Sequence, residues 1–287
     1  MHDPKMSEIR LLRESDIAAA MELKDFAGWN QTESDWRLLL KLEPDGCFAA
    51  LLGDQLVGTT TTTCYGRELA WIGMVLVRPE ERRSGVATKL MTTALDYLSQ
   101  RVATVKLDAT PQGKQVYEKL GFQVESHLER WSVVANSTKL VSEASAPATL
   151  DAKARRELFA LDRCAFNADR SQLLDALIDN ASVPPVLTRS GDGLLTGYAL
   201  SRPGSNAEYV GPVVAMEPEQ LGPLLDRMLS QLVSRRVYID FNTDSNKSGV
   251  LLERGFVKER GFIRMCRGKP STRTLPFVIG IAGPELG

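Results

Sequence analysis

Residues 71–88 read WIGMVLVRPEERRSGVAT, and this stretch decides the fold of the chain. Its first part, WIGMVLV, is an apolar run with the length of a buried strand. A turn containing proline follows, and the basic segment RRSG then leads directly into a helical pattern. The first turn of a helix carries backbone N–H groups without intrahelical partners and the positive end of the helix dipole. The stretch therefore predicts a buried strand followed by an anion-binding helix N-terminus.

Individual residues in this stretch fit a phosphate ligand. Gly85 leaves room for a phosphate close to the backbone, and the small Ala87 allows the same approach. Arg82 and Arg83 add positive charge at the rim. Taken alone, the pattern also fits a solvated basic turn, so its position after a buried strand supports the phosphate interpretation. The motif G-x-x-x-x-G-K-[ST] is absent, which excludes a P-loop, and a pyrophosphate suits the site better.

Hydrophobic periodicity predicts an α/β fold with a mixed sheet around this stretch. In the first half the order is helix, helix, three strands, helix, strand, helix, strand, with one β-α-β crossover near the middle of the sheet. The expected helices are 12–25, 33–42, 85–101 and 112–120, and the expected strands are 47–52, 55–65, 69–77, 103–108 and one from residue 122 onward.

The second half of the chain repeats the pattern of the first. The segments QLVGTTTTT, WIGMVLVRPEE, TVKLDAT and EKLGFQVESHLERWSV match GLLTGYALS, YVGPVVAMEPE, RVYIDFN and LERGFVKERGFIRMCR in the same order. Matching glycines are separated by 139 residues from Gly58 to Gly197 and by 134 residues from Gly121 to Gly255. Because these two separations differ by only a few residues, they indicate a duplication. We expect a first domain over 1–135, a linker rich in Ser, Ala and Thr over 136–149, and a second domain over 150–287.

Composition excludes several classes of function. With 35 basic and 36 acidic residues the net charge is −1, so no overall field attracts nucleic acid or an anionic membrane. The apolar runs are shorter than the ~20 residues that span a membrane, and no signal peptide opens the chain, so we expect a cytoplasmic protein without nucleic-acid or membrane partners. Four scattered cysteines and two histidines argue against a metal site. The sequence does not indicate an oligomeric state.

Two motifs at family spacing resemble the GNAT superfamily of acyl-CoA-dependent N-acetyltransferases. The first is V-x-P-x-x-R-R-x-G-V-A at 77–87, and the second is V-Y-E-K-L-G-F at 116–122. The resemblance covers about residues 8–133, and the repeat extends the fold, but not the motifs, to the second half. It implies two tandem GNAT-like domains, the second degenerate, with acetyl-CoA as the cofactor of the first.

The resemblance also implies roles for individual residues. It implies that the backbone of the strand before the proline pairs with the pantetheine arm of CoA, and that backbone amides of the basic loop hold the pyrophosphate. The tyrosine of the second motif, here Tyr117, donates a proton to the departing thiolate in much of the family, although a packing role for this amphipathic side chain also fits. The implied cofactor-binding residues are Met74, Val75, Leu76, Val77, Arg82, Arg83, Ser84, Gly85, Val86, Ala87 and Thr88.

The general base is not evident from the sequence. Many relatives place a glutamate in the strand before the V-x-P segment, but the counterpart here is Gly73, which cannot accept a proton. Asp108, at the end of the strand beside the expected cofactor, is the candidate catalytic carboxylate, acting through water or by holding the acceptor amine. It fits equally well as a cap of the turn before Pro111.

The acceptor pocket of such folds lies over the first two helices and their loop. Trp29, Asn30 and Asp35 are the candidate acceptor-binding residues, since an aromatic face and polar groups bind a cationic amine. The alternative is that Asp35 is a solvated helix residue and its neighbour Trp36 belongs to the core.

The second half keeps the sheet pattern without the chemistry. Two acidic residues follow its VVA strand where phosphates would lie, and Leu251 stands where the first half has Tyr117. We expect one active site per chain, with the second half closing over or extending its acceptor side. The predicted function is acetyl transfer from acetyl-CoA to a primary amine of a small molecule or peptide, by direct attack in a ternary complex. The alternative is a non-catalytic acyl-CoA sensor or interaction module.

Overall fold

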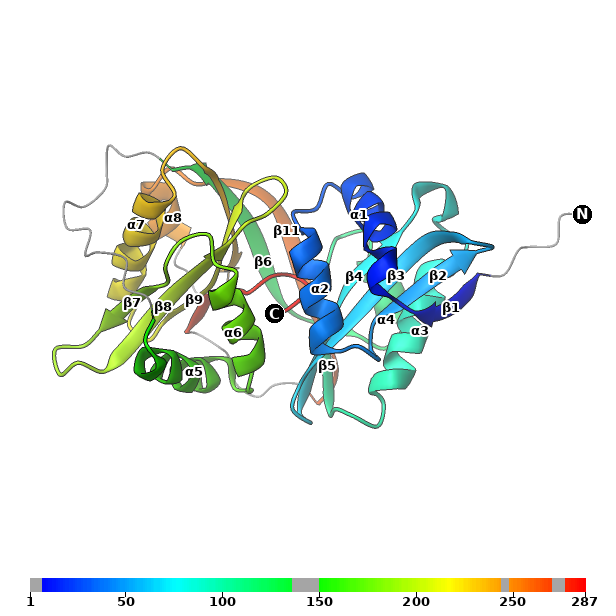
Figure 1. Cartoon of the computed structure of the whole chain (residues 1–287), viewed down its shortest axis with the longest axis horizontal. Coiled ribbons are helices and arrows are strands. Elements are labelled where there is room, and N and C mark those ends of the chain that lie inside the picture. The colour runs from blue at the N-terminus through cyan, green and yellow to red at the C-terminus, as the bar shows by residue number, and fades with distance from the viewer. Residues whose placement is uncertain (1–6, 136–149, 244–247, 270–276) are drawn as a thin grey trace, which may run out of the picture.

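In the part of the chain that the structure describes, twelve strands form one continuous mixed sheet that runs through both halves (Figure 1). The computed structural model describes residues 7–135, 150–243, 248–269 and 277–287, so the linker expected over 136–149 lies outside the described residues. Within these ranges the strand order is β1-β2-β3-β4-β5-β11-β6-β10-β12-β9-β8-β7. The strands are β1 (Glu8–Leu11), β2 (Phe48–Leu52), β3 (Gln55–Tyr65), β4 (Leu69–Val77), β5 (Thr104–Ala109), β6 (Gln123–Val134), β7 (Val186–Arg189), β8 (Leu195–Arg202), β9 (Glu208–Ala215), β10 (Arg236–Asn242), β11 (Val257–Gly268) and β12 (Val278–Gly280).

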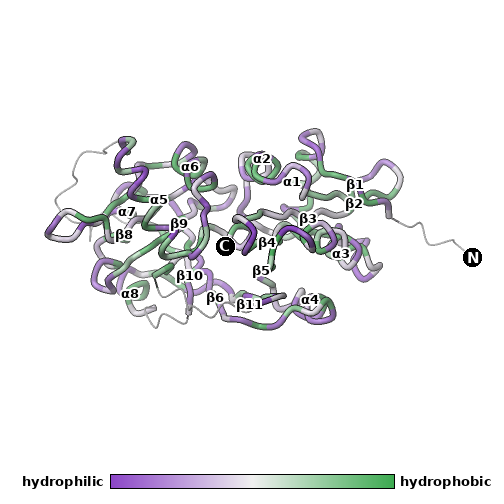
Figure 2. Tube along the Cα trace, turned by 90° about the horizontal axis from the view of Figure 1, so that it is seen from below, coloured by the Kyte–Doolittle hydropathy of each residue, from purple (hydrophilic) through white to green (hydrophobic). Residues whose placement is uncertain are grey.

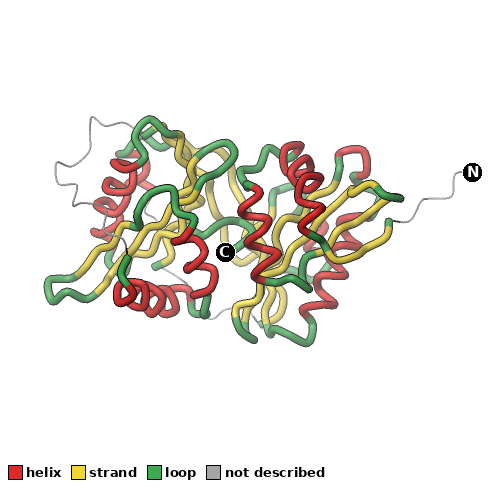
Figure 3. Tube along the Cα trace, in the orientation of Figure 1, coloured by secondary structure: helices red, strands yellow, loops and turns green. Residues whose placement is uncertain are grey.

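Helices cover both faces of this sheet (Figure 3). They are α1 (Ile17–Phe26), α2 (Glu33–Leu42), α3 (Val86–Leu98), α4 (Lys114–Lys119), α5 (Ala152–Phe166), α6 (Ser171–Asp179), α7 (Leu221–Gln231) and α8 (Ser248–Glu253). Short 3-10 turns η1 (Glu14–Asp16), η2 (Pro79–Glu81) and η4 (Pro218–Gln220) precede α1, α3 and α7. The predicted α/β class with a mixed sheet is confirmed. The sequence analysis missed only β1 in the first half, an edge strand of four residues.

The core is divided between the two faces of the sheet. Side chains from α1, α2, α5 and α6 share one hydrophobic cluster, which joins Trp36 and Leu23 of the first half to Leu158 and Tyr198 of the second. On the opposite face α3 packs on the first half and α7 on the second. Figure 2 shows α1, α2 and α6 together on one side of the strands. No helix in the described ranges is long and apolar enough to cross a membrane, and the expected cytoplasmic location stays a prediction.

The two halves exchange their last long strands. Strand β11, from the second half, lies between β5 and β6 of the first half, and β6 in turn pairs with β10 of the second. Figure 1 shows β6 and β11 crossing together between the two lobes. The sequence analysis expected two tandem domains, over 1–135 and 150–287, and described the strands of the first half within its own domain. The structure instead completes each half with a strand from the other, so neither half has all its strands alone.

Two buried ion pairs lie at this junction. Arg264 of β11 donates two hydrogen bonds of 2.8 Å to the carboxylate of Asp108 on β5. Arg130 of β6 donates two hydrogen bonds of 2.7 Å to Asp240 on β10. Each pair joins residues that face each other across neighbouring strands. Bidentate geometry of this kind compensates the cost of removing both charges from water.

Candidate functional site

Strands β4 and β5 separate at the centre of the first half. They pair in parallel only from Leu69 opposite Thr104 to Trp71 opposite Lys106. Just beyond, the register of β4 against β3 shifts by a bulge, and Met74 adopts a left-handed backbone with φ 49°. A bulge bends a strand and interrupts its pairing. Among the described residues, the divergence leaves this side of β4 without a neighbouring strand beyond Trp71, in the segment whose backbone the family resemblance pairs with a pantetheine arm.

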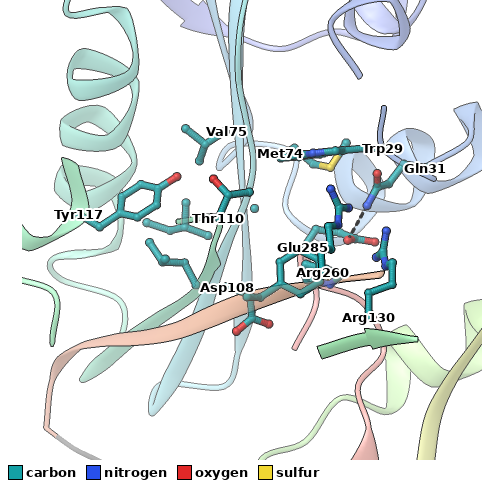
Figure 4. A pocket seen from close by; sticks show the side chains of 15 residues that line it. Trp29, Gln31, Met74, Val75, Asp108, Thr110, Tyr117, Arg130, Arg260 and Glu285 are labelled. Atoms are coloured by element: carbon teal, nitrogen blue, oxygen red, sulfur yellow. Dashed lines mark hydrogen bonds between the residues drawn. The ribbon is translucent and has the colours of Figure 1, made fainter. Parts of the chain in front are cut away.

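A pocket of about 560 Å³, open to solvent, occupies this divergence (Figure 4). Both halves of the chain line it. The first half contributes Trp29, Gln31, Ile72, Gly73, Met74, Val75, Leu107, Asp108, Thr110, Tyr117 and Arg130, and the second half contributes Arg260, Phe262, Pro284 and Glu285.

Tyr117 lies on α4 at one side of the pocket, with its hydroxyl pointing inward (Figure 4). Its ring packs edge-on against Phe122, with 6.2 Å between ring centroids. Burial raises the pKa of the phenol to about 12, which keeps the hydroxyl protonated at neutral pH. A protonated hydroxyl that faces a pocket is equipped to donate a hydrogen bond to a group that gains negative charge.

The predicted anion loop is exposed and ends at the N-terminus of α3. Arg83 and Gly85 both have left-handed backbones, with φ 66° and 90°, and Gly85 is the N-cap of the 13-residue helix. A Cβ on Gly85 would meet no protein atom within 4 Å, so within the protein its conformation, rather than crowding, favours glycine. The basic side chains, the exposed loop and the unpaired amides of the first helical turn fit a pyrophosphate.

Asp108 lies in the pocket wall but is held by another residue. Both its carboxylate oxygens accept hydrogen bonds from Arg264, and its side chain is fully buried. In Figure 4 its carboxylate points away from the centre of the pocket. This bidentate pairing places Asp108 in the strand exchange, and the catalytic role expected from the sequence stays a prediction.

Two of the three candidate acceptor residues contact the second half of the chain instead of the pocket. Asn30 accepts hydrogen bonds from the backbone of Asn206 and Ala207, at 2.9 and 3.0 Å. Asp35 accepts a 2.9 Å hydrogen bond from Arg202 and also accepts one of 2.7 Å from the backbone of Thr32, the N-cap of α2. Both side chains are buried and hold the two halves together. Trp29 does line the pocket, as expected.

Glu285 is the site residue that the sequence analysis missed. A Cβ added to Gly73 would lie 2.6 Å from the Cβ and 2.7 Å from the Cα of Glu285. The segment from the second half therefore docks directly on the glycine that stands where many relatives carry a glutamate. Trp71 fixes the segment by donating a 3.0 Å hydrogen bond to the carbonyl of Pro284. The available signal was one carboxylate after an apolar run, in FVIGIAGPELG.

The carboxylate of Glu285 is almost fully buried but hydrogen-bonded on both oxygens. It accepts a hydrogen bond of 2.9 Å from Arg202 and one of 2.8 Å from the side-chain amide of Gln31. Burial raises the pKa of Glu285, and the nearby charge of Arg202 opposes this shift. A carboxylate with a raised pKa at the wall of a pocket is a better proton acceptor than an exposed one.

The equivalent opening in the second half is filled. Strands β9 and β10 also pair over only two residues, but β12 lies between them and bonds to both. Beside α7, Arg254 donates two 2.7 Å hydrogen bonds to Asp226 and lies against Gly222, and Leu251 is buried in the core. A strand of the protein thus occupies the position that a pantetheine arm would need.

Comparisons with known proteins agree with the geometry of both halves. Residues 16–122 match the model described as "Acetyltransferase (GNAT) family", and residues 158–275 match a model described as "Acetyltransferase (GNAT) domain". YitH of Bacillus subtilis, described as an uncharacterized N-acetyltransferase, is 28% identical over 228 residues, which is 78% of each chain.

Solved structures show the same fold over the whole chain. A protein from Pyrococcus horikoshii, assigned as an acetyltransferase, matches with a TM-score of 0.83 and 23% identity, over 99% of this chain and 96% of that one. A GCN5-related N-acetyltransferase from Sphaerobacter thermophilus matches with a TM-score of 0.65 and 13% identity, over 94% and 98% of the two chains. Since each half also matches a model of one family, the chain belongs to the GNAT family of acetyltransferases and is an acyl-CoA-dependent enzyme with two family domains in tandem.

Proposed function

We propose that this enzyme transfers an acetyl group from acetyl-CoA to a primary amine, at one site that lies in the first half of the chain. The observation that carries the proposal is the contrast between the two halves. The first has an open strand divergence, a pocket lined by Tyr117 and, outside the pocket lining, a basic N-terminus of α3, whereas β12 fills the divergence of the second. The backbone of Met74–Val77 and the amides of residues 83–88 are the groups that would hold acetyl-CoA.

Two pocket residues, Glu285 and Tyr117, each carry out one proton transfer of the reaction. When bound, acetyl-CoA supplies a thioester whose carbonyl carbon the neutral amine attacks directly. Glu285 accepts the proton that the amine loses as the new C–N bond forms. Tyr117 donates its proton to the sulfur as the C–S bond breaks and regains one from solvent, to which Glu285 releases its own, so the products are the N-acetylated amine and the thiol of CoA. Because both halves hold the reactants in one pocket, positioning supplies a large part of the rate.

Titration calorimetry with CoA tests the location of the site. We expect one CoA bound per chain, and Arg83→Glu should weaken binding by about 10-fold or more, since a charge-assisted hydrogen bond contributes ~1.5–3 kcal/mol. Arg67→Glu is the matched control, because this exposed arginine lies in the turn at the opposite end of β4. Two equivalent sites, or equal effects of the two variants, would place the cofactor elsewhere.

The release of free thiol from acetyl-CoA in the presence of an amine library tests the transfer itself. Tyr117→Phe keeps the aromatic packing on Phe122 and removes only the hydroxyl. It should lower kcat by on the order of 10²-fold while CoA affinity stays within about twofold. CoA binding without thiol release from any amine would favour the acyl-CoA sensor.

A further inference from the structure

Arg260 presents an unpaired positive charge to the pocket. This half-buried side chain belongs to β11, and its guanidinium lies 4.9 Å from the centre of the Phe262 ring. Within the described part of the chain, no hydrogen bond or ion pair holds it. Burial lowers the pKa of Arg260, and the nearby charge of Arg130 lowers it further. The nearby Asp240, Tyr238 and Glu259 oppose this shift without cancelling it, so the position costs free energy.

Every other charged side chain of the pocket lining has a partner. These partners are Arg264 for Asp108, Asp240 for Arg130, and Arg202 for Glu285. Asp108 and Arg130 are thus paired one to one, Glu285 shares Arg202 with Asp35, and Arg260 is the lining residue whose charge has no direct partner in the described part of the chain. A ligand with an anionic group would neutralise that charge, whereas a purely cationic amine would be repelled.

Arg260 is not part of the duplicated scaffold. It faces Arg130 across the β11–β6 pair, and like charges placed opposite each other destabilise a sheet. The same 134-residue offset that relates Gly121 to Gly255 relates Ser126 to Arg260, so the first half has a neutral residue at the matching position. An added charge that breaks a packing rule is typical of a functional site.

We propose, building on the acetyl transfer above, that the acceptor is a small amino carboxylic acid whose carboxylate is bound by Arg260. Figure 4 shows Arg260 and Glu285 near each other, across the pocket from Tyr117. The amine of such an acceptor lies beside Glu285 and Met74, and its carboxylate reaches the guanidinium. Guanidinium groups also bind phosphate, but Glu285 would repel a doubly charged phosphate more strongly than a singly charged carboxylate.

A panel of matched amines tests the carboxylate. Alanine, methionine and phenylalanine are each compared with their carboxamide and their decarboxylated amine, by kcat/KM for thiol release. The acids should be the preferred substrates of the parent enzyme. Arg260→Met should lower kcat/KM for the acids by about 30- to 100-fold, the cost of removing one member of a buried charge pair, and change the values for the carboxamides by less than about twofold. Arg260→Lys should restore part of the loss.

Lys258→Met is the matched control, because it removes an exposed positive charge two residues away on the same strand. It should leave every kcat/KM within about twofold of the parent. Equal effects of Arg260→Met on acids and carboxamides, or a parent enzyme that prefers the decarboxylated amines, would overturn the inference. Preference for phosphoethanolamine over the acids would also overturn it, since the anion would then be a phosphate.

A binding measurement separates this inference from the proposed reaction. Each acid and its carboxamide are titrated by calorimetry into enzyme saturated with CoA, so that no turnover is required. Binding of an acid that is lost in Arg260→Met supports the carboxylate site even where no amine yields thiol. Acids and carboxamides that bind equally, or that both fail to bind, contradict it even where acetyl transfer to other amines is observed.

Discussion

Replacing Gly73 by alanine tests whether the segment around Glu285 completes the active site. The added Cβ would lie 2.6 Å from the Cβ of Glu285 and 3.0 Å from its carbonyl oxygen. Carbon atoms in contact lie ~3.5–4.0 Å apart, so the segment must move by about 1 Å. It cannot slide freely, because Trp71 holds the carbonyl of Pro284 at 3.0 Å and Tyr65 holds that of Leu286 at 2.6 Å. A displacement of ~1 Å at a reacting group lowers rates by on the order of 10²-fold.

The assay for Gly73→Ala is kcat/KM for thiol release, with CoA affinity and thermal unfolding measured alongside. We expect a loss of about 10²-fold in kcat/KM and, from overpacking, a loss of ~1–3 kcal/mol in stability. Gly191→Ala is the control, because a Cβ there meets no atom within 4 Å. In a double-mutant cycle, Gly73→Ala and Glu285→Gln should not be additive. Parent activity in Gly73→Ala would refute the role given to this segment.

Two further predictions concern the carboxylates of the pocket. Burial raises the pKa of Glu285, so it loses its proton-accepting form as the pH falls through that raised pKa. Below that pKa, a plot of log kcat/KM against pH should have a slope of about two in the parent, because both the amine and Glu285 become protonated. In Glu285→Gln the slope should be about one, from the amine alone. A slope of two in both enzymes would exclude Glu285 as the base. Asp108→Asn leaves Arg264 buried without its partner and should cost ~3–5 kcal/mol in chemical denaturation. Full stability with lost turnover would return Asp108 to a catalytic role.

Features that depend on neighbouring residues were predicted well from the sequence. The bounds of β4 agree with the predicted strand, and the left-handed Gly85 begins α3 where the basic loop ends. Tyr117 lies in the pocket, as its motif implied. In each case the strand period, the turn or the helix cap is set by side chains within a few positions of each other.

Features that depend on distant pairs were not predictable in this way. Asn30 and Asp35 have the composition of an amine-binding loop, yet their partners lie in the second half, more than 160 residues away. Glu285 reaches Gly73 only because β12 first fills the opening of the second half and directs the chain toward the first. Neither contact leaves a periodic signal, since each is a single polar group placed by tertiary packing.

The strand exchange itself is invisible in the sequence because both arrangements satisfy the same chemistry. Strands β6 and β11 have nearly the same burial pattern, and each carries an arginine at the matching position, Arg130 or Arg264. Because each half also carries an aspartate, Asp108 or Asp240, either arginine could form the same ion pair in either half. What differs is the rest of the strand, since β11 brings Arg260 and Phe262 to the pocket where β6 would bring Ser126 and Leu128. The exchange therefore leaves the paired charges unchanged and replaces two of the side chains that line the pocket.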